Sequence, residues 1–537
     1  MCRVRSTAEE KARKFPRFSS GSSNENGPRC PKTIIDEIIE AGSFTVIADE
    51  GTDSGNVEQL SISARYVNSK KMVCERFLGF VPLEELTGEA ISHGIIKFLR
   101  DDCGIDLKYL HGQAYDGPGA MRGDYKGAQA RITDEFPKAL YMHCASHSLN
   151  LVFMTHSMVD QIQGTFKLLR KVIFFFTYSA VKSTALKKEI EQSIGTNKSL
   201  VELCKIRWIE RHDAVIQFVQ LFLPIVKTLS TISSGCTKGR TKAKEYLECS
   251  KDFEFILTLH ILVQTSAVFM PLSEKLQDKS IDLLKCCELV DNAIRVLKDY
   301  RADKSVFERI FKKARVCALI LVDQSFVLPH ETPAVIDHYR AHIFEKYLIE
   351  LEERLQERFT RHRNGVFHLQ RLVPAHFGKD TLSKDERHGG ACTNRESIME
   401  VSKIYKDHVA SVDEVLAEYD LWRTSFSLTE NDQLPRTAID ALNACDSYYK
   451  IINVLLQIFA TLPVASATAE RSFSTMRRLK TYLRATMAEN RLTSLALINI
   501  HREVVVKPTD VVQQYYFKPR RFNHHLPQDN NNHKDLE

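Results

Sequence analysis

Residues 44 to 143 alternate between two kinds of hydrophobic periodicity, and this alternation strongly limits the folds that the chain can adopt. The short β-branched run from Phe44 to Ala48 predicts a buried strand that ends at Asp49. The segment from Leu60 to Tyr66 alternates apolar with polar residues and predicts a second strand, and Val73 to Phe80 predicts a third. Three strands joined by short turns are expected to form an antiparallel meander.

Helical and strand patterns then follow one another. The run from Leu107 to Ala114 predicts a fourth strand that stops at Asp116, and residues 139 to 143 predict a fifth before another helix. The order β-β-β-α-β-α-β-α is that of an RNase H-like sheet, in which the first and fourth strands are neighbours. Asp49 and Asp116 are therefore expected at one end of the sheet.

The rest of the chain has an almost wholly helical pattern. A loop at Pro463 leads into a helix that carries Glu470 on its first turn, and Thr486 to Glu489 has the form of a capping box that opens a last helix. The predicted fold class is an α/β RNase H-like domain interrupted by a large all-α insertion and closed by C-terminal helices. The expected parts are a lead-in (1–32), the sheet domain (33–150), the helical insertion (151–445), the closing helices (446–505) and a polar tail (506–537).

Composition narrows the class of protein only modestly. The net charge of +6 slightly favours binding to polyanions. The 13 cysteines are odd in number and scattered, and no secretory signal opens the chain, which favours a reduced intracellular protein over a secreted disulfide framework. We find no apolar run approaching the ~20 residues of a membrane span, so we expect no membrane partner.

Each of three acids has an ordinary explanation when taken alone. Asp49 lies in an acid-rich turn, Asp116 begins a common Asp-Gly-Pro turn, and Glu470 is favoured by the dipole at a helix N-terminus. However, a carboxylate at the end of a buried strand is costly unless it is paired or binds a cation. Three carboxylates brought together from such distant positions are what a two-metal phosphoryl-transfer site requires.

Two further motifs are open to more than one interpretation. Cys144 and His147 suggest zinc ligands, but no second pair stands at a suitable distance, so we predict no structural zinc. His147 is better placed to orient a substrate or a neighbouring carboxylate. Arg207 and Trp208 could clamp a phosphate and stack an unpaired base, although a core tryptophan beside a surface arginine is the simpler explanation.

Taken together, these segments resemble the hAT superfamily of DNA transposases and their domesticated descendants, in the branch with zinc-finger MYM-type-like and THAP-type repressor-like proteins. The resemblance extends from about residue 33 to 505. Five matching segments occur in family order: Ile47 to Ser61, Tyr115 to Gly117, Cys144 to Leu151, Arg207 with Trp208, and Ser466 to Ser474.

The resemblance implies roles for individual residues. Asp49, Asp116 and Glu470 would be the Asp-Asp-Glu triad, holding Mg²⁺ or Mn²⁺ for DNA strand cleavage and transfer. Trp208 would stack an extruded base, and His147 would lie close to the active site. Further expectations are a homodimer or higher oligomer through C-terminal helices from about residue 453 to 500, a DNA partner, and a nuclear, otherwise cytoplasmic, location.

The chain also departs from the family pattern. Gly51 stands where relatives in this branch usually have a bulkier residue, and no N-terminal zinc-finger module is evident. The expectation is therefore either a truncated gene product or a chain that depends on a partner to reach DNA. Three alternative functions are therefore considered. The first is a transposase core that still binds metal, and the second is a domesticated non-catalytic dimerising regulator or scaffold. The third and weakest is an RNase H-like nuclease unrelated to transposition.

Overall fold

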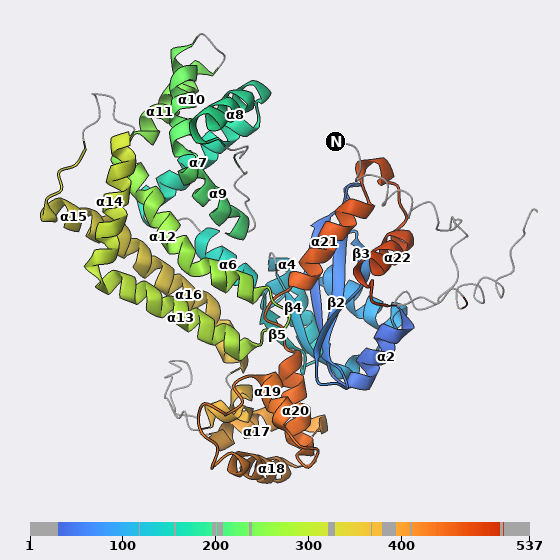
Figure 1. Ribbon diagram of the computed structural model, residues 1–537. Coiled ribbons are helices and arrows are strands. Elements are labelled where there is room, and N and C mark those ends of the chain that lie inside the picture. The colour runs from blue at the N-terminus through green and yellow to red at the C-terminus, as the bar shows by residue number, and fades with distance from the viewer. Residues whose placement is uncertain are drawn as a thin grey trace, which may run out of the picture.

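A mixed five-stranded sheet forms one side of the molecule, and a longer helical part forms the other (Figure 1). The computed structural model describes residues 31–116, 119–154, 157–195, 200, 208–235, 239–320, 328–366, 368–377, 394–408, 411–504 and 509. The lead-in at 1–30 and most of the tail from 505 lie outside these ranges.

The strands run in the order β3-β2-β1-β4-β5. Their bounds are β1 (Phe44–Thr52), β2 (Glu58–Val67), β3 (Val73–Leu83), β4 (Leu110–Tyr115) and β5 (Leu140–His143). The first three strands pair antiparallel, whereas β4 lies parallel to β1, and β5 lies parallel to β4. The predicted meander and the predicted adjacency of the first and fourth strands are both confirmed.

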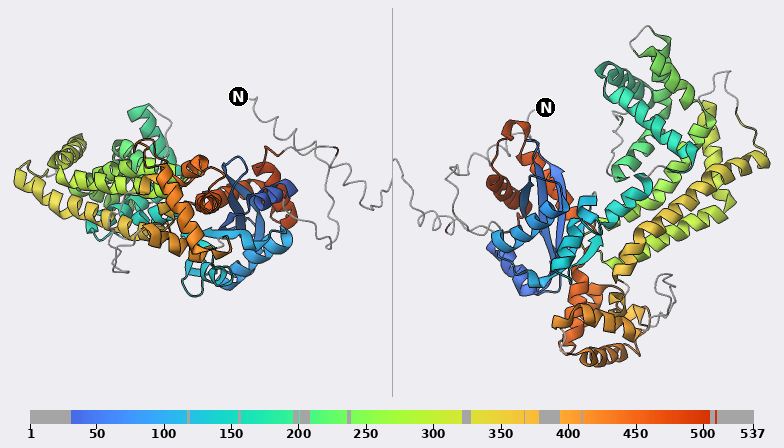
Figure 2. Two further views of the ribbon diagram at one scale, coloured as in Figure 1. Left: turned by 90° about the horizontal axis from the view of Figure 1, so that it is seen from below. Right: turned by 180° about the vertical axis from the view of Figure 1, so that it is seen from behind.

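Helices cover both faces of the sheet because β1 is apolar on both sides. On one face Val46 and Ala48 share a core with α2 (Lys32–Ala41), α3 (Gly88–Lys97) and α5 (Ala128–Glu135). On the other face lie α20 (Lys450–Thr461), α21 (Ala467–Leu479) and α22 (Glu489–Ile500). Phe473 of α21 packs against Phe80 of β3, so the last described helices return to the sheet that the first strands form (Figure 2).

The helical part lies between α6 (Ala145–Met154) and α20 in the sequence. It contains α7 (Asp160–Thr177), α8 (Ala180–Ile194), α9 (Trp208–Gln220), α10 (Phe222–Ser234), α11 (Arg240–Ser250), α12 (Phe253–Leu276), α13 (Leu283–Ala302), α14 (Lys304–Ile320), α15 (Pro333–Tyr339) and α16 (Lys346–Val366). A smaller unit follows, with α17 (Asn394–Ile404), α18 (Val412–Ser425) and α19 (Ala438–Ala444), and α20 joins this unit to the sheet.

The central helix of the larger helical unit is more apolar than the sequence analysis expected. By length and composition α12 could cross a membrane, but 61% of its most apolar window is buried inside the protein. It packs against α7, α9, α13 and α14. Burial on several sides accounts for the apolar character of this helix without a bilayer.

A buried polar network fixes the C-terminal helices to the first hairpin. Lys480 Nζ lies 2.6 Å from Asp53 Oδ2 and 3.0 Å from Glu489 Oε1, and the Lys480 side chain is 2% exposed. Gln59 Nε2 donates to both acids, at 3.1 and 2.8 Å. Glu489 is thus the first residue of α22 and an ion-pair partner of Lys480. The N-cap residue is Ala488, and no side chain forms a capping hydrogen bond there. The predicted capping box is wrong because its glutamate has a stronger, cationic partner.

Replacing Lys480 with methionine is expected to destabilise the protein by about 2–3 kcal/mol. The Asp53 carboxylate would stay buried without a cation, although it would keep the backbone N–H groups of Gly55 and Val57 as donors. Burial raises the pKa of Asp53, but the hydrogen bond from Lys480 and these N–H groups lowers it overall. The stabilisation is therefore present at neutral pH and lost as pH falls through that lowered pKa.

Urea denaturation at pH 7 and again in acid would measure this effect. The difference between Lys480→Met and the unaltered protein should shrink in acid. Lys285→Met is the matched control, because the pair of Lys285 with Glu288 is exposed. Equal stability of the two variants at pH 7 would contradict the proposed strength of the network.

Candidate functional site

The register of the central strands brings the first two predicted acids together. Ala48 of β1 pairs with Tyr115 of β4 in the parallel ladder, so Asp49 and Asp116 each follow a paired residue. Asp49 lies inside β1 rather than after its end, because the antiparallel pairing with β2 continues to Thr52. The two acids come from positions far apart in the sequence and meet at one end of the sheet.

The third predicted acid approaches the same place from α21. Asp49 and Gly51 share one face of β1, since side chains alternate along a strand. The ring of Phe473 packs on that face so closely that a Cβ on Gly51 would lie 3.1 Å from it. Glu470 is one helical turn before Phe473 and so shares its face. The glycine that departs from the family pattern is therefore the residue that lets α21 sit close to β1.

Electrostatics place the three acids near one another. Burial raises the pKa of Asp49 well above its usual range, the Asp116 carboxylate raises it further by its charge and by a hydrogen bond, and Glu470 adds to the effect. The Glu50 N–H donates to Asp49 Oδ1 at 2.9 Å and opposes this shift. A hydrogen bond between two carboxyl groups needs a shared proton. The cluster is therefore short of positive charge.

Cys144 connects the loop before α21 to the start of α6. Its buried Sγ accepts hydrogen bonds from the backbone N–H groups of Ser466, at 3.3 Å, and His147, at 3.4 Å. Burial, with Glu470 and Asp116, raises the pKa of this thiol to about 12. The group is therefore a neutral thiol that holds the two segments in register, and the Ala145 N–H adds a bond of 2.8 Å to the Val464 carbonyl.

His147 lies beside the second acid. Its Nδ1 is 3.7 Å from Asp116 Oδ2. Burial lowers the pKa of His147, the Asp116 charge opposes this, and Arg122 and Arg358 lower it further. The ring is therefore neutral at pH 7, beside two cations from α4 (Gly119–Arg122) and α16.

The sequence analysis missed several contributors to this site. Arg122 and Arg358 are ordinary in the sequence, because only the fold brings both arginines near His147. Glu50 is a fourth acid: burial, then Asp116, raises its pKa, and its buried Oε2 has no hydrogen-bond partner among the described residues. The predicted Arg207 lies outside the described residues, and Trp208 begins α9 with a side chain that is likewise not described.

Oxygen ligands of this kind suit Mg²⁺ or Mn²⁺. Asp49 and Asp116 fit a cation best, since the two carboxyl groups are in contact and Asp49 is buried. Among the described residues, however, no three His, Cys, Asp or Glu side chains are close enough together to hold one ion. Glu470 is thus near enough to influence Asp49 but does not complete a three-ligand set with Asp49 and Asp116.

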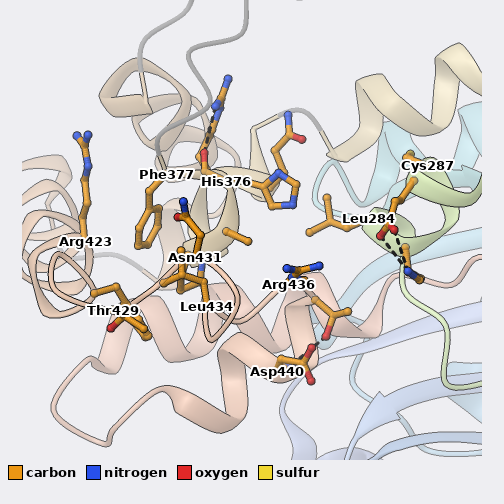
Figure 3. Close-up of a pocket in the computed structure, with 18 of the residues that line it drawn as sticks. Leu284, Cys287, His376, Phe377, Arg423, Thr429, Asn431, Leu434, Arg436 and Asp440 are labelled. Atoms are coloured by element: carbon orange, nitrogen blue, oxygen red, sulfur yellow. Dashed lines mark hydrogen bonds and ion pairs between the residues drawn. The ribbon is translucent and has the colours of Figure 1, made fainter. Parts of the chain in front are cut away.

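A separate cavity of about 1640 Å³ lies between α13 and the smaller helical unit. Figure 3 shows Arg436 near its centre, between His376 and Asp440, with Arg423 at one side. None of Asp49, Asp116 and Glu470 lines this cavity, and the basic and acidic side chains that line the cavity are nearly equal in number. The cavity is therefore not an extension of the acid cluster.

Two family models match the chain on either side of the large helical unit. Residues 28–127 match the ZMYM1/FAM200 RNase-like domain, and residues 434–504 match the hAT family C-terminal dimerisation region. The chain is therefore similar to hAT-family proteins. The first match contains Asp49 and Asp116, and the second contains Glu470, so the three acids come from both matched parts of the chain.

Two curated proteins are similar to most of the chain. The 52 kDa repressor of the inhibitor of the protein kinase from Homo sapiens is 23% identical over 516 residues, which cover 92% of this chain and 66% of the relative. The Mus musculus protein of the same name is 23% identical over 491 residues, covering 87% and 63%. The chain thus spans slightly less than two thirds of the length of these relatives.

Proposed function

We propose that this chain is a hAT-family protein that cleaves and transfers DNA strands at the acid cluster of Asp49, Asp116 and Glu470, with the helical part as an insertion into its RNase H-like domain. The observation that carries the proposal is the contact between the buried carboxyl group of Asp49 and the partly exposed one of Asp116, with two arginines near the neighbouring His147. Such a site is unfavourable without a cation and has cations in place for a phosphate.

The residues divide the work as follows. Asp49 and Asp116 would hold Mg²⁺, and Glu470 would approach once a cation attracts it. Mg²⁺, when bound, supplies Lewis-acid activation of a water or a 3′-hydroxyl and stabilises the leaving oxygen. Arg122 and Arg358 would bind the phosphate, and neutral His147 would position Asp116.

A nuclease assay tests this proposal. Purified full chain with Mg²⁺ or Mn²⁺ should nick branched or end-mimicking DNA, and Asp49→Asn or Asp116→Asn should abolish nicking. Even outer-shell partners of a metal contribute about 10- to 100-fold, so loss of a ligand should cost more than about 100-fold. Asp101→Asn, at an exposed position, is the control. Absence of nicking by the unaltered chain would contradict the proposal.

The second candidate function is a non-catalytic, dimerising regulator in the nucleus. It is favoured by the name of both relatives, which calls them repressors, and by the incomplete three-ligand set among the described residues. In that case the chain would bind DNA or a partner as a dimer without nicking. The same assay, run beside a DNA-binding measurement, separates the two functions.

Self-association is proposed through exposed apolar residues of the matched dimerisation region. The apolar side chains of α20 are already used within the chain, since Leu455 and Leu456 are buried. Outside this core, the neighbouring side chains of Leu483 and Tyr482 are 91% and 87% exposed. An exposed aromatic and leucine pair is unfavourable in water and favours a contact with a second copy.

The double variant Tyr482→Ser with Leu483→Asp is therefore expected to be monomeric. In a two-fold interface each residue is lost twice, and burying one leucine stabilises by about 1.5–3 kcal/mol, so dissociation should be favoured more than about 100-fold. Light scattering after gel filtration measures the mass. Leu428→Asp is the control, because Leu428 is 98% exposed and lies outside the matched region. A dimeric double variant would place the interface elsewhere.

A further inference from the structure

An apolar groove opens on the helical part, far from the acid cluster in the sequence. It has a volume of about 630 Å³. Its apolar lining comes from α9, α10 and α14: Val219, Phe222, Leu223, Val316, Cys317 and Ile320. Val316 and Ile320 are 51% and 64% exposed, so the apolar lining reaches the surface along α14. This volume is in the range of sites that hold several side chains of a bound ligand.

The rim of this groove carries charge of one sign. Arg309, Lys312 and Lys313 line it from α14, His260 lines it from α12, and no acidic residue lines it. Among the described residues, Lys312 and Lys313 form no ion pair, and the Arg309 guanidinium donates to the Ser305 hydroxyl at 2.9 Å. The three cations precede Val316 and Ile320 at helical spacing, so they lie on the same face of α14. The first part of this face is basic and the last part is apolar.

We propose that this groove binds a short amphipathic helix of a partner protein, with its apolar side chains in the groove and acidic side chains against Arg309, Lys312 and Lys313. Charge complementarity identifies the occupant as acidic, and the apolar walls identify it as amphipathic. A nucleic acid would satisfy the cations but would leave the apolar walls unused, since its backbone is charged. Insertion of an amphipathic helix between packed helices is a common mode of peptide recognition.

The cations determine which partners are accepted more than how tightly they bind. Each lysine is at the rim and screened by water, so its contribution to affinity is small, but a peptide of like charge is rejected. The apolar walls provide most of the binding free energy. Changes in charge and changes in apolar surface should therefore have different effects, which an experiment can separate.

Fluorescence anisotropy with two synthetic helical peptides tests the proposal on the full chain. Both peptides carry leucines at i, i+4 and i+7, and they differ only in having glutamate or lysine at the flanking positions. The glutamate peptide is expected to bind at least about 10-fold more tightly than the lysine peptide. Lys312→Glu with Lys313→Glu should reverse this preference, and Val316→Asp should weaken both peptides. The matched control is Lys187→Glu with Lys188→Glu, on the exposed face of α8.

Several results would overturn the proposal. Equal binding of the two peptides, or unchanged binding to the Lys312/Lys313 variant, would show that the rim does not select acidic partners. Displacement of the glutamate peptide by a short DNA strand would identify a nucleic-acid surface. A change in the mass of the chain with Val316→Asp, measured by light scattering, would identify a contact between copies. Circular dichroism of each variant checks that it is folded.

Discussion

Asp49→Asn is expected to stabilise the metal-free protein and to remove its response to divalent cations. The Asp49 carboxylate is buried beside Asp116 and Glu470, and both acids repel its charge. An asparagine has the same shape, carries no charge, and its amide can donate to Asp116 in place of the shared proton. Because the substitution removes a buried and repelled charge, the free energy of unfolding at pH 7 in metal-free buffer should rise.

The pH dependence has a defined sign. The pKa of Asp49 is raised on folding, so the folded protein holds this proton more tightly than the unfolded chain does. The contribution of Asp49 to stability is therefore most favourable below its unfolded pKa and declines as pH rises toward the raised folded pKa. Asp49→Asn removes this decline, and the stability difference between the two proteins should grow with pH and then level off.

Thermal unfolding in EDTA and in millimolar Mg²⁺ or Mn²⁺ measures both effects. The unaltered protein should gain stability with the cation, because a cation that binds only the folded state stabilises it. Asp49→Asn should gain none, whereas the exposed control Asp101→Asn should behave as the unaltered protein. If Asp49→Asn is less stable than the unaltered protein in EDTA, the repulsion among the acids must already be offset without a cation. That result would also weaken the case for a metal site.

Some of this site could be predicted from the sequence. Period-two and helical patterns predict the order of the strands, and that order alone makes Asp49 and Asp116 neighbours. The position of Glu470 follows from the family resemblance, and the structure adds its physical basis, which is the contact of Phe473 with Gly51. That contact depends on the absence of a side chain, so no periodicity reveals it.

Other contributors leave no local signal in the sequence. Arg122 and Arg358 look like surface residues in the sequence, and only the fold brings both of them near His147. The sequence suggests Cys144 only as a zinc ligand, whereas its observed contacts are with backbone N–H groups of segments more than 300 residues apart. Pairing across such separations depends on tertiary packing, which outweighs local preference.

Substitution of Arg65 is expected to cause the largest loss of stability among the predicted variants. Arg65 lies on β2 and is 1% exposed. Its Nη1 lies 2.8 Å from Glu75 Oε1 and donates to the Lys279 carbonyl at 2.7 Å. Its Nη2 donates to the carbonyls of Ile281 and Ala460, both at 3.4 Å. One guanidinium thus joins the sheet, the segment that leads into α13, and α20.

Arg65→Ala should destabilise the protein by about 3–5 kcal/mol, because removing one partner of a buried ion pair leaves the other charge uncompensated. Among the described residues, Glu75 would keep the hydrogen bond from the Thr468 hydroxyl but would lose its cation. The three carbonyls would also lose a donor. Arg100→Ala is the matched control: its pair with Glu135 is exposed and should contribute less than about 1 kcal/mol.

A double variant separates the charge from the packing at this junction. Glu75→Gln in the Arg65→Ala background removes the uncompensated charge, so it should recover part of the lost stability, whereas Glu75→Gln alone should be destabilising. Urea denaturation gives the free energies of unfolding, and limited proteolysis reports on the junction itself. Because Arg65 binds carbonyls on both sides of the junction, cleavage between α12 and α13 should accelerate in Arg65→Ala. Unchanged cleavage there would mean that the apolar core alone holds the sheet and the helical part together.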